Sequence, residues 1–113
     1  MSTVTTGDPV VDPVVDPVVD PVVTDPEFYS VVFENDRVRV LEYRDEPGAR
    51  THEHSHPDMV IIPLTTFRRR LTLGDRSVDV EKKCHEAGWV DAQTHIGENI
   101  GTSPSHALFV ELK

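Results

Sequence analysis

Cysteine is almost absent from this sequence of 113 residues, which contains only Cys84. A single cysteine cannot form an internal disulfide or build a cysteine-rich zinc site, so we expect a reducing compartment. Long apolar runs are also absent, since no stretch approaches the roughly 18 apolar residues that a membrane-spanning helix needs. The first residues lack the basic region and apolar run of a secretory signal. These absences predict a cytoplasmic protein with no membrane partner.

Basic residues are few: Lys and Arg number 11, against 20 Asp and Glu, and the formal net charge is -9. Such a charge repels phosphate backbones and anionic bilayers, which excludes nucleic acids and membrane surfaces as partners bound by charge. The length fits one domain and leaves no room for a second core. We therefore expect a small-molecule partner.

The N-terminal segment has low complexity. Residues 8–23 repeat Asp-Pro-Val-Val four times, and a fifth Asp-Pro follows at Asp25 and Pro26. Proline at every fourth position removes backbone donors and fixes φ, which excludes a helix and a central strand. We predict an extended, polyproline-like arm over 1–26 and a globular domain over 27–113. Two roles are open for the arm: a solvated tail, or a segment that binds a partner or clasps a second subunit.

Beyond the arm, the sequence changes to short β-type runs separated by turn residues. No window of a dozen residues has a helical period, and 81–87 is the only stretch where a short helix would fit. The fold class is therefore all-β, a small sandwich or barrel. The eight runs that we expect to form strands are 28–33, 37–44, 52–56, 59–64, 67–73, 77–83, 88–96 with breaks, and 106–112.

Three of the six histidines occupy alternate positions: His52, His54 and His56. Alternate side chains of a strand share one face, so all three can point the same way. Imidazole is a common ligand of zinc, copper, iron and nickel. A third ligand from a distant strand would complete one face of an octahedral site, and His95 is the best candidate. The alternative is a set of core histidines without a metal, which would bury unpaired imidazoles at a cost.

Two spaced motifs contain these histidines. Gly48, five residues and then His54-Ser55-His56 form the first, and His95, three residues and Asn99 form the second. Their order and spacing resemble the paired motifs of small single-domain cupins of the RmlC-like superfamily, over about residues 33–113. The resemblance implies a double-stranded β-helix, a jelly-roll-like barrel. It also implies a metal site of the three-histidine type, formed by His54, His56 and His95.

The sequence departs from the cupin pattern at two places. The metal-binding Glu of the first motif would fall at Val60 or Ile61, which cannot bind a metal, and the Pro-x-Gly of the second motif is replaced by 91–93. Three neutral imidazoles leave a divalent ion its full charge, which favours an anionic, chelating ligand. The resemblance implies iron(II), with zinc, nickel, manganese or copper as alternatives.

Other residues are weaker candidates for the site. An additional metal ligand, or a residue that supports the ligands, is expected among His52, Asp58, Gln93 and His106; strand parity places His106 inward with Leu108, Val110 and Leu112. Arg69 shares the apolar face of 67–73, and an inward Arg needs an anion, for which a substrate carboxylate is one possibility. Adjacent Cys84 and His85 would point to opposite faces of a strand, which argues against a catalytic dyad.

These observations leave three functions open. The first is a mononuclear iron(II) dioxygenase acting on a β-dicarbonyl or oxo acid, because cupin dioxygenases bind substrate and O2 at neighbouring positions of the iron. The second is a non-catalytic cupin that binds a metal or small ligand, and the third is a metal-dependent isomerase or lyase with His52, His106 or Asp58 as base. We also expect a homodimer, because a small barrel exposes sheet edges. Deleting residues 1–26 is expected to leave the metal site intact.

Overall fold

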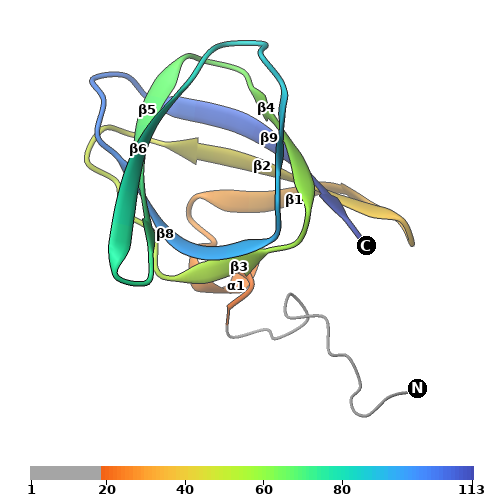
Figure 1. Cartoon of the computed structure of the whole chain (residues 1–113). Helices are drawn as coiled ribbons and strands as arrows, with labels where there is room; N and C mark the ends of the chain where they lie inside the picture. Colours follow the sequence, from red (N-terminus) through yellow and green to blue (C-terminus); the bar gives the residue numbers. More distant parts are fainter. Residues whose placement is uncertain (1–18) are drawn as a thin grey trace.

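The computed structural model describes residues 19–113. This part of the chain contains one short helix, α1 (Pro21–Thr24), and nine strands arranged as a barrel (Figure 1). The strands are β1 (Tyr29–Glu34), β2 (Val38–Asp45), β3 (His54–His56), β4 (Met59–Pro63), β5 (Phe67–Leu73), β6 (Arg76–Lys82), β7 (Gly88–Val90), β8 (Gln93–Asn99) and β9 (Ser105–Leu112). The all-β prediction is confirmed.

The strands form two antiparallel sheets. One sheet has the order β1-β2-β9-β4-β7, and the other has the order β3-β8-β5-β6. Strands far apart in the sequence are neighbours in both: β2 pairs with β9 along its whole length, and β3 pairs with β8. The second pairing positions the site, because it places the two histidine motifs side by side.

The apolar core lies between the sheets and follows the period of two that a half-buried strand requires. In β4, for example, Met59 and Ile61 are buried while Val60 and Ile62 are half-buried. Buried polar residues gather on β3 and β8 instead. The core consists of Tyr29, Leu41, Tyr43, Met59, Ile61, Phe67, Ala107 and Phe109.

The predicted strands agree with the structure, with three corrections. The run 88–96 contains two strands, β7 and β8, separated by 91–92. The stretch 81–87 contains no helix; it holds the end of β6 and a turn. The inward parity predicted for the last strand is wrong: the buried side chains of β9 are Ser105, Ala107, Phe109 and Glu111.

Helix α1 contradicts the expectation that the proline repeats exclude a helix. Asp20 is its N-cap, and the side chain accepts a hydrogen bond from the Val22 amide at 2.9 Å. Pro21 occupies the first turn, where a helix needs no hydrogen bond from the backbone nitrogen and where the fixed φ of proline is already helical. One turn therefore fits between the prolines at positions 21 and 26.

The predicted arm, 1–26, is only partly described by the structure, since 1–18 lie outside the described residues. The remainder packs against the barrel: Pro21 is buried, and the Ser55 amide donates to the Val19 carbonyl oxygen at 2.8 Å. Figure 1 shows α1 directly beside β3. Residues 19–26 are thus continuous with the folded domain. In the described part of the chain, no helix has the length and hydropathy needed to span a bilayer.

Candidate metal centre

His54, His56 and His95 converge inside the barrel. His54 and His56 occupy alternate positions of β3 and face inward, and His54 is the direct cross-strand partner of His95 on β8. The ring centroids are 4.8 Å apart for His54 and His56, 5.0 Å for His54 and His95, and 5.3 Å for His56 and His95. One nitrogen from each ring lies within 4.8 Å of the others, which is close enough for a common ion.

Burial keeps these rings in the form that binds metals. Desolvation, with a smaller contribution from the neighbouring His56, lowers the pKa of His54 to about 4. The same two causes hold the pKa of His95 well below its usual range. Both imidazoles are therefore neutral near pH 7, and each offers a lone pair.

Oxygen atoms fix the orientation of two rings. His56 Nδ1 lies 2.8 Å from Glu111 Oε2, and His95 Nδ1 lies 2.6 Å from Gln93 Oε1. Carboxylate and amide oxygens accept hydrogen bonds, so each Nδ1 carries the proton and each Nε2 is left as the metal-binding atom.

The third ring is held between two residues of the N-terminal part of the chain. His54 Nδ1 lies 3.4 Å from Asp25 Oδ2, and its Nε2 lies 3.4 Å from the Tyr29 hydroxyl. Among the described residues, His54 Nδ1 and His56 Nε2 are the buried side-chain polar atoms without a hydrogen-bond partner. Leaving such atoms unpaired is unfavourable. A divalent ion among the three rings would satisfy His56 Nε2, while His54 Nδ1 faces the Asp25 carboxylate and leaves Nε2 of that ring for the ion. The donor set of three imidazoles fits a transition metal.

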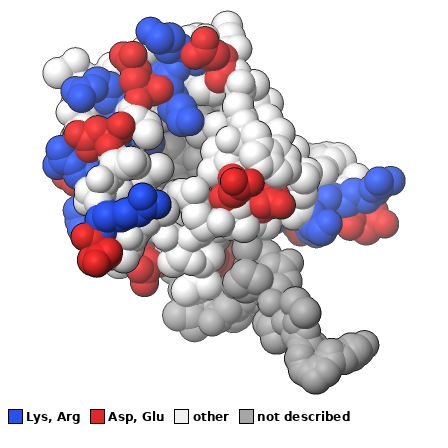
Figure 2. Space-filling model, in the orientation of Figure 1, with Lys and Arg blue, Asp and Glu red and all other residues white. Residues whose placement is uncertain are grey.

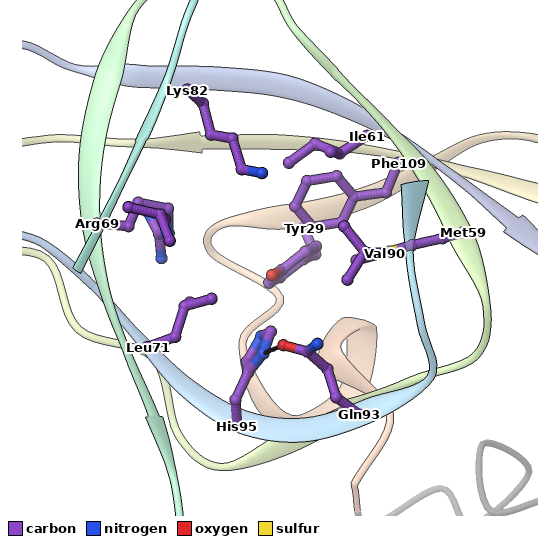
Figure 3. Close-up of a pocket in the computed structure, with 11 residues that line it drawn as sticks. Tyr29, Met59, Ile61, Arg69, Leu71, Lys82, Val90, Gln93, His95 and Phe109 are labelled. Atoms are coloured by element: carbon purple, nitrogen blue, oxygen red, sulfur yellow. Dashed lines mark hydrogen bonds between the residues drawn. The ribbon is translucent and has the colours of Figure 1, made fainter. Parts of the chain in front are cut away.

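A pocket of about 130 Å³ reaches the cluster at His95. Figure 3 shows the aromatic and aliphatic side chains of Met59, Ile61 and Phe109 around it, with Arg69 and Lys82 pointing inward from β5 and β6. Its mouth opens in the face seen in Figure 2, where the surface is hollowed beside β5 and β6. The cavity is therefore apolar, with positive charge on one side and the histidine cluster at its end.

Arg69 lies at this pocket, as its inward parity predicts. It is 8% exposed, and its Nη1 donates to Asp45 Oδ2 at 2.8 Å while Nη2 donates to the Tyr43 hydroxyl at 3.1 Å. The anion that an inward Arg requires is thus supplied by the protein itself. Asn99 donates to the other oxygen of Asp45 at 2.9 Å, so the second histidine motif also supports this ion pair.

Similar solved structures identify the architecture. A cupin domain from Bordetella pertussis Tohama I is 28% identical over 75% of this chain and 91% of its own, with a TM-score of 0.70. An uncharacterized conserved protein with a double-stranded β-helix domain from Klebsiella pneumoniae is 21% identical, with 74% of each chain covered and a TM-score of 0.60. This chain has the cupin fold.

The remaining comparisons add only a further example of the same fold. The polyketide cyclase RemF from Streptomyces resistomycificus is 20% identical over 74% of this chain and 63% of its own, with a TM-score of 0.57, which shows a shared fold. Comparisons with protein-family models and with curated proteins found no match.

Three of the weaker candidates lie away from the histidine cluster. The side chain of His52 is exposed, because β3 begins only at His54 and the alternation does not extend back to it. Asp58 is exposed and accepts from the Ala92 amide. His106 faces away from the core and contacts Glu42 at 2.7 Å. None of them is a ligand in this geometry, whereas Gln93 contacts His95 as a supporting residue.

Sequence reasoning missed three residues of the centre: Asp25, Tyr29 and Glu111. The wrong parity of the last strand concealed Glu111, which alternates with Ala107 and Phe109 on the inner face of β9. Asp25 belongs to the arm whose deletion was expected to leave the metal site intact, and its contact with His54 places it beside the cluster. Cys84 is exposed, and its thiol donates to the Leu64 carbonyl oxygen.

Proposed function

We propose that this cupin binds a divalent metal ion through His54, His56 and His95 and acts as an iron(II) dioxygenase on a small chelating organic substrate. The observation that carries the proposal is the set of three buried imidazoles, two of them neutral by their lowered pKa values, at the end of an apolar pocket. His54, His56 and His95 would hold the ion and would leave room beside it for substrate and O2. Bound iron(II) would supply Lewis-acid and redox chemistry there.

The pocket favours an anionic substrate. Three neutral ligands add no negative charge, Arg69 and Lys82 point inward, and no acidic side chain lines the cavity among the described residues. Lys82 has no ion-pair partner within the described part of the chain, so its ammonium group can neutralise a bound carboxylate or enolate. A β-dicarbonyl or a 2-oxo acid combines two chelating oxygens with such a charge.

The other lining residues hold the substrate and exclude water. Met59, Ile61, Val90 and Phe109 form an apolar wall opposite the two cations. An apolar wall that excludes water strengthens the attraction between the cations and a bound anion, because the local dielectric constant is low. The Tyr29 hydroxyl, whose pKa is raised by burial, keeps its proton and can donate a hydrogen bond.

A non-oxidative isomerase, lyase or cyclase is the second candidate, and the similarity to a polyketide cyclase favours it. Such reactions need a base that moves a proton within the pocket. His52, His106 and Asp58, the bases expected for this chemistry, lie outside the pocket, which leaves Lys82 among its lining residues. This shortage of bases is the reason for preferring the dioxygenase.

The test is anaerobic reconstitution with iron(II), followed by measurement of O2 uptake with a panel of β-dicarbonyls and 2-oxo acids. Wild type is compared with His54→Ala and His95→Ala, and with His106→Ala as a matched histidine control away from the centre. We expect one ion per chain in wild type and His106→Ala, loss of binding in the two ligand variants, and uptake that depends on substrate.

Each other outcome has a definite meaning. Binding with turnover of substrate but no O2 uptake would support the isomerase or cyclase. Binding with no turnover would leave a non-catalytic metal-binding cupin. Equal binding by His54→Ala and wild type would show that the three histidines do not hold the ion.

A further inference from the structure

The last Asp-Pro unit of the arm reaches the histidine cluster. Asp25 is fully buried, and its carboxylate accepts hydrogen bonds from the His52 amide at 3.0 Å, from His52 Nδ1 at 2.9 Å and from the Thr24 hydroxyl at 2.8 Å. Its second oxygen lies 3.4 Å from Nδ1 of His54. A buried carboxylate therefore stands directly behind one of the three imidazoles.

The preceding Asp-Pro unit, Asp20 and Pro21, is linked to His56 through a series of side-chain contacts. Asp20 pairs with Arg39 through both guanidinium Nη atoms, at 2.9 and 3.0 Å. Arg39 Nε donates to Glu111 Oε1 at 3.0 Å, and Glu111 Oε2 lies 2.8 Å from His56 Nδ1. The exposed fractions of the Arg39 and Glu111 side chains are 17% and 4%, so this series of contacts is largely shielded from water.

Residues 19–22 are anchored on the barrel by contacts that involve no histidine side chain. The Ser55 amide donates to the Val19 carbonyl oxygen, which attaches the segment to β3 between His54 and His56. Pro21 is buried, and Val22 packs against the apolar core. Residues 19–26, which we name the docking segment, thus cover the outer side of the strand that holds two ligands.

We propose that the docking segment contributes to metal binding. Asp25 is a positioning residue for His54, and Asp20 supports His56 through Arg39 and Glu111. The proposal rests on the metal site proposed above. It assigns a function to the end of the Asp-Pro repeats, and it predicts that docking of this segment and metal binding stabilise each other.

The charge of the site supports this coupling. The ligand set has no carboxylate, because Val60 and Ile61 stand where the cupin pattern has its Glu, so an ion there keeps its full charge. Asp25 and Glu111 place negative charge behind His54 and His56, where it makes the imidazoles stronger donors. Carboxylates in this position orient the ring and fix its tautomer, and their loss typically lowers metal affinity about 10- to 100-fold.

The first test measures Zn²⁺ affinity by competition with a fluorescent chelator, using the full chain. We expect Asp25→Asn, which keeps the size of the side chain but removes its charge, to weaken binding by about 10- to 100-fold. Asp20→Asn acts through two intervening residues and should have a smaller effect. Asp58→Asn removes a surface carboxylate that accepts a hydrogen bond from the Ala92 amide, away from the histidine cluster, and it should bind like wild type.

The second test needs no variant. Coupling is reciprocal, so Zn²⁺ should slow hydrogen exchange at the amides of Val22, Val23, Thr24 and Asp25, which form the turn of α1. Metal binding also stabilises the whole fold, so a segment that is not coupled to the site would be slowed no more than a strand away from it, such as β6.

The outcomes separate the two proposals. Absence of Zn²⁺ binding by wild type would overturn the metal site itself. Wild-type binding with an unchanged affinity in Asp25→Asn, or with exchange in the docking segment slowed by Zn²⁺ no more than in β6, would overturn the coupling alone. If Asp25→Asn fails to fold, Asp20→Asn and the exchange measurement decide.

Discussion

Gly97 shows how a single missing side chain makes room for a buried charge. A Cβ atom at this position would lie 2.5 Å from Arg69 Nη2, which is too close for any real contact. Gly97 follows His95 at the next inward position of β8, and Leu71 of β5 is its cross-strand partner. The glycine therefore allows the guanidinium to lie beside the histidine cluster.

We predict that Gly97→Ala displaces Arg69 from its contacts with Asp45 and Tyr43 and lowers the free energy of unfolding by about 1–3 kcal/mol. Gly88→Ala is the matched control, because a Cβ there meets nothing within 4 Å. Urea denaturation measures the effect. Equal stability of the two variants would contradict the close packing of Arg69 against Gly97.

Asp45 should make stability depend on acid pH. Burial raises the pKa of this carboxyl, but hydrogen bonds from Tyr43 and Arg69 outweigh it and leave the pKa below the usual 3.8. Since the folded pKa is the lower one, the unfolded chain takes up the proton first as the pH falls. The ion pair contributes fully above that usual value, and its contribution is lost as the pH falls below it toward the folded pKa.

Asp45→Asn is therefore expected to be less stable than wild type by about 3 kcal/mol at pH 7, because it leaves the Arg69 charge without its partner. The difference between the two proteins should shrink on acidification to about pH 3. Urea denaturation at a series of pH values measures it. Parallel stability curves would show that Asp45 does not titrate as argued.

At the scale of strands and helices, the sequence predicts which side chains alternate along a strand. It does not predict features that depend on how distant strands pair. The period of two places Arg69 inward on β5 and brings His54 and His56 onto one face of β3. The same rule fails for β9, because Leu108, Val110 and Leu112 lie on its outer face while Ala107, Phe109 and Glu111 lie inside. It also fails for His52, since the start of β3 is set by pairing with β8.

The contacts of the docking segment could not be predicted from the sequence for a related reason. Proline content correctly excludes a long helix, but one capped turn satisfies the same constraints. Its contacts with Arg39, His52 and Ser55 come from distant parts of the sequence. Long-range contacts of this kind leave no local signal in the residues that make them.

Strand β1 is an edge of its sheet, and an exposed edge is a site for pairing with a second chain. Its Val31, Val32 and Phe33 side chains are 42%, 51% and 53% exposed. The homodimer remains a prediction, and we propose that this edge forms it. Phe33→Lys should then shift light-scattering mass from dimer to monomer.

Trp89→Lys, at the opposite edge of the same sheet, is the control for the loss of an exposed aromatic residue. It should leave the dimer intact. A wild-type protein that is monomeric at all concentrations would contradict the proposal.

At the scale of the whole molecule, the barrel assembles one site from both sheets and from the docking segment. The four-stranded sheet supplies the three histidines, Arg69 and Lys82, while the five-stranded sheet supplies Glu111 and the apolar wall. Although the chain has a net charge of -9, the charged side chains that line the pocket are those of two basic residues, Arg69 and Lys82. A large acidic partner would be repelled by the negative surface, whereas a small anion can enter the pocket and meet its positive charge.

X-ray absorption spectroscopy of the protein loaded anaerobically with iron(II) tests the three-histidine site directly. We expect one ion per chain, three imidazole ligands, and oxygen ligands at the remaining positions. The imidazole contribution should fall in His54→Ala and stay unchanged in His106→Ala. A spectrum with fewer than three imidazoles, or one that His54→Ala leaves unaltered, would contradict the three-histidine site.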